Sequence, residues 1–219
     1  RGILEKKISK IKKIRFKVLK EAKKHISDLG WNKKLLLKTQ HNLKFKNNEI
    51  SALFPNGYYD LLEMYLDEIN NKMISESKKI NLIRLRVHER IRELIILRLK
   101  IMSENKKMIS KTFIFLLFPK NYKISLRIIY KTIDEIWFLS GDNSTDFNFY
   151  SKRIILASIY SAVMIHFINN NDLDKTIIFL DKQLKKVSKI PKLKNRINDI
   201  VSFLPKIYKI RNRFLSSKQ

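Results

Sequence analysis

The sequence predicts an all-α fold, and three observations support this prediction. Hydrophobic residues make up 44% of the 219 residues, which is enough for a folded core. Glycine and proline occur only four times each, so little material is present for the turns of an all-β protein. Long stretches rich in Ile, Leu, Lys, Glu and Asn repeat their apolar residues at helical spacing. The length favours a single domain.

The predicted helices follow from this spacing and from the residues that interrupt it. The first apolar pattern continues until Gly30, and Pro55 ends a short helix for which Asn47 or Asn48 provides the cap. Pro119 closes the Phe-rich segment before it, and Ser140-Gly141 ends the next helix. We expect about nine or ten helices, which include residues 3–29, 32–40, 47–54, 58–77, 80–103, 105–118, 121–139, 149–169 and 173–189.

The stretch Ile154–Ile168 is apolar nearly all round. It is too short to span a bilayer comfortably, so we expect a helix buried in the protein. We divide the chain into one domain over 1–190, in which 1–60 resembles a helix-turn-helix unit and 61–190 contains the longer helices. A separate amphipathic helix is expected over 191–219.

The formal net charge of +27 is large enough to attract a polyanion or an anionic membrane. A second interpretation is that the charge lies on solvated faces, because Lys, Ile and Asn are over-used together, as in AT-rich coding sequences. The absence of cysteine excludes disulfides, thiol catalysis and thiolate metal sites.

No catalytic or metal-binding motif is found. No histidine follows an acid by three residues, as a helical di-iron site requires, and no Gly-rich phosphate loop or Gly-x-Ser-x-Gly elbow is present. We therefore expect a binding protein with no catalytic residues, no metal and no cofactor. The four histidines lie far apart, at His25, His41, His88 and His166.

The last segment has the pattern of a basic amphipathic helix. Such a helix can lie in the membrane interface, with basic side chains near lipid phosphates. The alternative is a helix that packs on the core or on a dimer partner, and Pro205 would kink either version. The predicted membrane-binding residues are Leu193, Ile197, Ile200, Leu204, Ile207, Lys206, Lys209 and Arg211.

Three stretches of the sequence have the pattern of a known family. They are Asp134 to Arg153 with Leu156 to Tyr160, then Gly30-Trp31 with Leu53 to Leu62, and Thr176-x-x-Phe-Leu-Asp181. These stretches resemble the ninth COQ protein family, whose members are lipid-binding accessory proteins of ubiquinone synthesis, and they follow the family's order over nearly the whole chain. The family usually has Trp where this chain has Phe149, so the indole donor is lost.

The resemblance implies a dimeric TetR-like fold with an apolar cavity for phospholipid or isoprenoid quinone. It also implies a membrane-binding last helix and a partner, the di-iron hydroxylase that acts late in ubiquinone synthesis. We expect the dimer interface at 149–169 and 173–189, where pairing across a two-fold axis buries an apolar helix. The apolar residues expected to line the cavity are Phe113, Phe115, Ile129, Ile133 and Trp137.

In the family, the position of Arg153 is associated with binding of the phospholipid head group. A guanidinium can grip a phosphate through paired N–H donors. The alternative is an ion pair between Arg153 and Asp146 or Asp134.

The loop before Arg153 combines acids and aromatics, which suits a docking surface for the hydroxylase. The alternative is a capped helix start with Phe147 in the core. The predicted docking residues are Ile136, Asp142, Asp146, Phe149 and Tyr150.

We therefore predict a non-enzymatic accessory protein that presents a quinone intermediate to the hydroxylase. We expect it to be peripheral on the cytoplasmic face of a bacterial membrane or, alternatively, on the matrix side of the mitochondrial inner membrane. The main alternative is a TetR-type DNA-binding regulator that uses residues 33–62, although the presumed recognition segment 47–52 carries Glu49 and no arginine. Binding to nucleic acid is therefore not expected. An isoprenoid-modifying enzyme lacks candidate acids and bases.

Overall fold

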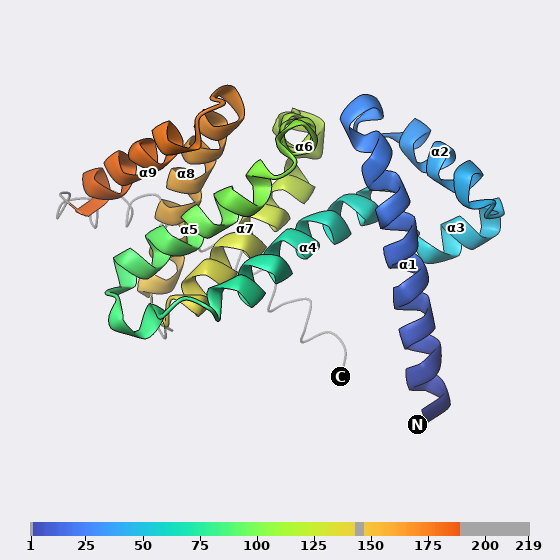
Figure 1. Cartoon of the computed structure of the whole chain (residues 1–219), viewed down its shortest axis with the longest axis horizontal. Coiled ribbons are helices and arrows are strands. Elements are labelled where there is room, and N and C mark those ends of the chain that lie inside the picture. Colours follow the sequence, from blue (N-terminus) through green and yellow to red (C-terminus); the bar gives the residue numbers. More distant parts are fainter. Residues whose placement is uncertain (1, 143–146, 189–219) are drawn as a thin grey trace, which may run out of the picture.

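The computed structural model describes residues 2–142 and 147–188, and the secondary structure of these residues is helical. The predicted all-α fold is confirmed. Figure 1 shows residues 2–53 at one end, which we call the N-terminal unit, and a body formed by the other helices. The helices are α1 (Gly2–Leu29), α2 (Lys33–Leu43), α3 (Asn47–Leu53), α4 (Tyr58–Ser77), α5 (Val87–Ser103), α6 (Lys106–Leu117), α7 (Tyr122–Leu139), α8 (Phe147–Asn169) and α9 (Leu173–Ser188), with 3-10 turns at Leu82–Arg84 and Pro119–Asn121.

The body is a layered bundle, which α4 connects to the N-terminal unit. Helix α4 packs against α5 and α7, α5 packs against α9, and α8 contacts α6, α7 and α9. Leu94, Ile95 and Leu99 of α5 are fully buried between these neighbours. Helix α5 is therefore the central helix of the body.

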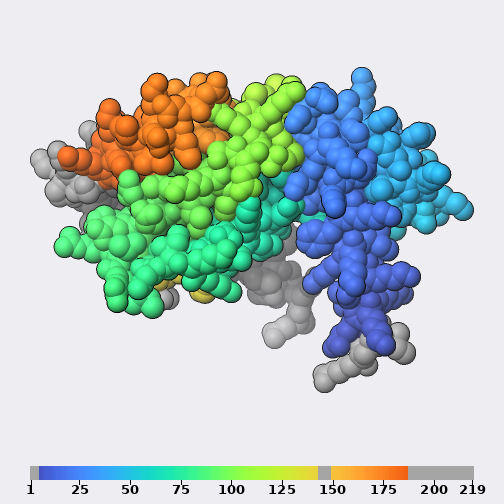
Figure 2. Space-filling model, in the orientation of Figure 1, coloured from blue at the N-terminus to red at the C-terminus, as the bar shows by residue number. Residues whose placement is uncertain are grey.

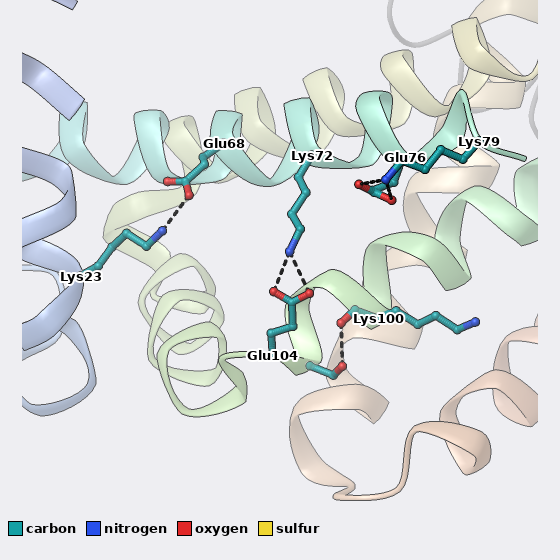
Figure 3. Close-up of polar contacts among 8 residues, drawn as sticks. Lys23, Glu68, Lys72, Glu76, Lys79, Lys100 and Glu104 are labelled. Atoms are coloured by element: carbon teal, nitrogen blue, oxygen red, sulfur yellow. Dashed lines mark hydrogen bonds and ion pairs between the residues drawn. The ribbon is translucent and has the colours of Figure 1, made fainter. Parts of the chain in front are cut away.

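A buried hydrogen bond joins the N-terminal unit to the body. The indole Nε1 of Trp31 donates to Thr112 Oγ1 over 3.0 Å, and both side chains are buried. An ion pair between Lys23 and Glu68, 2.7 Å long, connects α1 with α4 (Figure 3). Because both charged groups are partly exposed, the ion pair contributes at most about 1 kcal/mol. The Trp31 contact is the stronger link, and it explains the Gly30-Trp31 pair of the sequence.

The first turns of α1 extend beyond the rest of the molecule, as Figure 2 shows. Residues 5–13 are all exposed, whereas Val18 and Leu19 are buried. Lys6, Lys10 and Lys13 share one side of this helix, because their spacing follows the helical period. The projecting part of α1 is therefore a basic surface on the N-terminal unit.

The prediction of one helix over 80–103 is wrong at its start. Helix α4 ends at Ser77, and the chain makes a 3-10 turn before α5 begins. Arg90 stabilises this connection, since its guanidinium donates to the carbonyl oxygens of Leu85 (2.8 Å) and Ile83 (3.1 Å). A periodic apolar pattern does not reveal such a side-chain contact to the backbone.

Helix α8 is longer and more exposed than we predicted. Over Phe149–Asn169 it has the length and composition that crossing a membrane requires. Of the most apolar 18-residue stretch of this helix, 39% is buried. Core helices of soluble proteins meet the same criterion, so this is weak evidence for a span. Ile154 and Ile165 are 43% and 47% exposed, so one apolar side of α8 faces away from the core.

Candidate functional site

The end of α7 is shaped by a glycine and an arginine. Gly141 has a φ of +79°, and a Cβ atom at this position would lie 3.0 Å from Nη1 of Arg90. The same Nη1 donates to the carbonyl oxygen of Ser140 over 3.2 Å. A side chain at position 141 would therefore disturb both the backbone turn and the Arg90 contact, which explains the Ser-Gly pair before the acidic loop.

Arg153 lies at the centre of a buried ionic cluster beside this turn. Its Nε donates to Asp134 over 2.7 Å, and its Nη1 lies 3.4 Å from Asp142 and 3.2 Å from the carbonyl oxygen of Phe149. The guanidinium also stacks on the Phe149 ring, 3.3 Å from its centroid. The side chains of Arg153 and Asp142 are only 8% and 5% exposed.

This arrangement corresponds to the alternative that we weighed for Arg153, an ion pair with Asp134. Asp142 takes the second place, while Asp146 lies outside the described residues. The guanidinium is engaged by this chain's own carboxylates. Removal of one partner from a buried ion pair typically costs about 3–5 kcal/mol, so Arg153 has a structural role that is independent of any lipid.

The predicted docking residues divide into exposed and buried groups. Tyr150 is 42% exposed and Phe149 is half-buried, and their rings meet edge-to-face with centroids 5.2 Å apart. Ile136, in contrast, is 0% exposed, so our expectation that it contributes surface is wrong for this conformation. It lies in the hydrophobic core.

An apolar cavity of about 70 Å³ lies among α6, α7 and α8. Phe113 and Ile129, two of the predicted lipid-binding residues, line it. Phe115 packs instead against Tyr58 and Tyr59, with ring centroids 6.1 and 5.9 Å away. Ile133 is 1% exposed and is not among the lining residues. The lining residues are Leu66, Arg98, Phe113, Leu116, Leu117, Ser125, Ile128, Ile129, Thr132, Tyr160, Ser161, Met164, Ile165 and Ile168.

A second, wider groove of about 560 Å³ lies among α5, α7, α8 and α9 and contains Trp137. The buried Nε1 of Trp137 has no hydrogen-bond acceptor among the described residues. Lys152 lies over the indole ring at 5.5 Å and also donates to Asp142 over 2.8 Å. Trp137 therefore faces this groove and not the cavity with Phe113 and Ile129.

The rim of this groove is charged. Arg92 pairs with Asp181, with 2.6 Å between Nε and Oδ1, and this hydrogen bond raises the pKa of Arg92. Nearby on α7, burial raises the pKa of Glu135, and the neighbouring charge of Asp134 adds to the effect.

Among the described residues, no group of three His, Asp or Glu side chains is arranged to hold a metal ion.

Sequence reasoning missed Arg98, which is 1% exposed and lines the cavity. The sequence nevertheless contains a signal for the burial of Arg98. Arg98 follows Ile91 and Leu94 at helical spacing, so it occupies a core position within an otherwise apolar run.

The predicted helix-turn-helix-like unit corresponds to α2 and α3. Leu61 and Leu62 are fully buried and Phe54 is 1% exposed, as its packing requires. Helix α3 begins with Lys46 at the cap position, and Glu49 accepts the backbone N–H of Lys46 over 2.7 Å. The expected caps, Asn47 and Asn48, lie inside the helix instead.

Comparison with known proteins connects these features to a family. The COQ9 family model matches residues 122–191, which include α7, the acidic loop, α8 and α9. The mitochondrial "Probable ubiquinone biosynthesis protein coq9" of Dictyostelium discoideum is 25% identical over 90% of this chain and 68% of its own length. The rat COQ9 protein is 25% identical over 86% of this chain, which spans 59% of the rat protein.

A third relative, the mitochondrial coq9 protein of Schizosaccharomyces pombe, is 25% identical over 89% of this chain and 78% of its own length. Among solved structures, a TetR transcriptional regulator from Nitrosomonas europaea superimposes with a TM-score of 0.64. The superposition covers 80% of this chain and 98% of the regulator at 16% identity, which shows that the fold is TetR-like. The chain is thus similar to the COQ9 ubiquinone biosynthesis proteins, in keeping with the resemblance of its motifs.

Proposed function

We propose that this chain is a non-enzymatic accessory protein of ubiquinone biosynthesis that binds an isoprenoid quinone or phospholipid. The names of its relatives support the pathway. The observation that carries the binding proposal is the apolar cavity among α6, α7 and α8, three helices that contribute Phe113, Ile129 and Ile165 to its wall. Apolar walls with few polar groups are typical of a ligand site.

The accessory role also requires a partner and a membrane. We propose that the surface around Phe149 and Tyr150 docks a membrane-associated di-iron hydroxylase, to which the quinone intermediate is presented. The chain would act as a homodimer held at the membrane by the amphipathic segment 191–219, which lies outside the described residues. Because the relatives are named mitochondrial, we place it on the matrix side of the inner membrane rather than in a bacterium.

The alternative function, DNA binding, is not favoured. The relatives named above are ubiquinone biosynthesis proteins, and the likeness to the regulator is one of fold. Helix α3, the presumed recognition helix, carries Glu49 in its exposed first turn, which opposes the phosphate backbone of DNA.

Mass spectrometry of lipid that co-purifies with the full chain tests the proposal. We expect a bound isoprenoid quinone or phospholipid. The variant Ser161→Phe, which adds a ring to the cavity wall, should carry less of it. Ser158→Phe is the matched control, because Ser158 lies on the exposed side of the same helix. Protein purified without a delipidation step that yields no extractable lipid would contradict the proposal.

A further inference from the structure

The cavity among α6, α7 and α8 has a buried cation in its wall. Arg98 is 1% exposed, and its Nε donates to Tyr160 Oη over 2.7 Å. Its Nη1 contacts Asn70 Oδ1, and its Nη2 lies 3.5 Å from Thr132 Oγ1. All three partners are neutral. Within residues 2–142 and 147–188, no carboxylate lies within ion-pair distance of Arg98.

A buried charge is normally paired, because transfer from water into the interior is costly without a counter-charge. A guanidinium has five N–H donors, and the contacts of Arg98 engage three of them. The other two donors and the positive charge remain uncompensated by the described residues. Since Arg98 also lines the cavity, a bound group can supply what the chain lacks.

Two hydroxyl groups beside Arg98 strengthen this assignment. Tyr160 and Thr132 are 2% and 1% exposed, and both line the same cavity. Each hydroxyl oxygen accepts or approaches an N–H of Arg98, which leaves its own O–H free to donate. One guanidinium and two hydroxyl donors therefore converge on the polar end of an otherwise apolar space.

We propose that Arg98, Tyr160 and Thr132 form an internal site for the anionic oxygen head, a carboxylate or phosphate, of a single-chain amphiphile. The proposal rests on the lipid binding proposed above and specifies how the ligand is oriented. The head enters first, and the apolar chain follows the cavity wall outwards. Hydrogen bonds between charged groups and an oxyanion are the strongest that a protein offers to such a head.

The size of the cavity determines how much of the ligand it holds. About 70 Å³ is several times the roughly 10–15 Å³ that one water needs, but less than the roughly 300–1,000 Å³ of common ligand pockets. Leu117 and Ile165 line the cavity and are 59% and 47% exposed, so they mark its mouth. The head and the first carbons fit inside, and the rest of the chain lies over these exposed apolar side chains.

Arg98 is better suited to the head group than Arg153. The Arg153 guanidinium already contacts Asp134 and Asp142, so a phosphate would have to compete with two carboxylates for it. Arg98 has no such competitor among the described residues. The charge of Arg153 is thus balanced by carboxylates of this chain, whereas Arg98 has no counter-charge among the described residues.

Three probes with the same hydrocarbon chain test the proposal: oleate, oleyl phosphate and oleyl alcohol. Binding to the full chain is measured by displacement of a fluorescent fatty-acid analogue. We expect one or both anionic probes to bind at least about tenfold more tightly than the alcohol. The tighter anion identifies the preferred head. Equal binding of all three would overturn the Arg98 site and leave lipid binding intact, whereas no binding of any probe would overturn both.

Variants assign the preference to the site. Arg98→Met and Tyr160→Phe should weaken the anionic probes towards the affinity of the alcohol, which itself stays unchanged. Arg127→Met, which removes an exposed positive charge from α7, is the control for general attraction and should keep the preference. If Arg98→Met does not fold, Tyr160→Phe and the wild-type comparison still decide. An undiminished preference for anions in Tyr160→Phe and Arg98→Met would contradict the proposal.

Discussion

Two arginines, Arg98 and Arg153, are almost fully buried, and their neighbours give them different roles. Arg153 lies between Asp134 and Asp142 and stacks on Phe149, so it holds the end of α7 and Asp142 against α8. The described neighbours of Arg98 are neutral and leave its charge unbalanced. The two roles therefore do not follow from the residue type, which is the same. They follow from whether a carboxylate lies beside the guanidinium.

The loop aromatics give the first prediction. Tyr150→Ala should weaken association with the hydroxylase at least about tenfold, because truncation of an anchoring aromatic typically costs about 2 kcal/mol or more. The melting temperature should change little, since Tyr150 is 42% exposed. Titration calorimetry with the purified hydroxylase measures the affinity. Tyr130→Ala is the control, because Tyr130 is similarly exposed but lies far along α7 from the loop.

Phe149→Ala should also weaken docking by about tenfold or more. Unlike Tyr150, it should lower the melting temperature, because the ring supports the guanidinium of Arg153. Unchanged affinity in both variants would remove the docking site from this loop.

The sequence could predict some residues of the candidate site but not others. Arg153, Phe149 and Tyr150 were predicted because they lie together in one motif, and Phe113 and Ile129 because large apolar residues were in excess on their helices. Arg98, Thr132 and Tyr160 come from three different helices, so no local pattern brings them together. Ile136 was misplaced because a position next to a loop does not determine which side of α7 faces the core.

At the scale of elements, the spacing of apolar residues predicted most helices and their order correctly. Helix α9 begins as expected, since Asp172 accepts the backbone N–H groups of Asp174 (2.9 Å) and Lys175 (3.3 Å). The error after α4 has a physical cause. The apolar residues of 80–86 continue the helical pattern, but Arg90 ties the carbonyl oxygens of this segment into a non-helical turn.

The contact between α1 and α2 gives a pH-dependent prediction. Hydrogen bonds from Lys24 and Asn42 lower the pKa of Glu21 from 4.5 to about 2, with Lys24 as the largest cause. A lowered pKa stabilises the fold above pH 4.5, and this stabilisation is lost as the pH falls towards 2. Glu21→Gln should therefore melt below wild type near neutral pH, and the difference should shrink in acid. A constant difference across pH, measured by thermal denaturation, would contradict the assignment.

The amphipathic segment after α9 gives the next prediction. Deletion of residues 192–219 should abolish binding to anionic liposomes while the rest of the fold persists, because each basic residue near the surface contributes roughly 1 kcal/mol. Flotation at low and high salt measures this, and salt should weaken wild-type binding. The control is a triple variant that removes charge from the projecting part of α1: Lys6→Gln, Lys10→Gln and Lys13→Gln. Unchanged flotation after the deletion would assign the segment a packing role.

For the whole molecule, the exposed apolar residues of α8 and α9 favour a homodimer. Ile154 and Ile178 are 43% and 55% exposed on these helices. We expect a dimer at micromolar concentration by light scattering, because pairing across a two-fold axis would cover both side chains. Ile178→Glu should produce a monomer, whereas Ile83→Glu, at an 87% exposed position before α5, should not. A wild-type monomer at this concentration would contradict the prediction.

The unbalanced charge of Arg98 also affects how much of the protein a cell retains. A chain folded around an uncompensated cation is less stable when empty than when an anion occupies the cavity. Small losses of stability increase the fraction of chains that unfold and are degraded, and they change abundance several-fold. A cell short of the amphiphile would therefore keep less of this protein at the same rate of synthesis, so that its level follows the supply of its ligand.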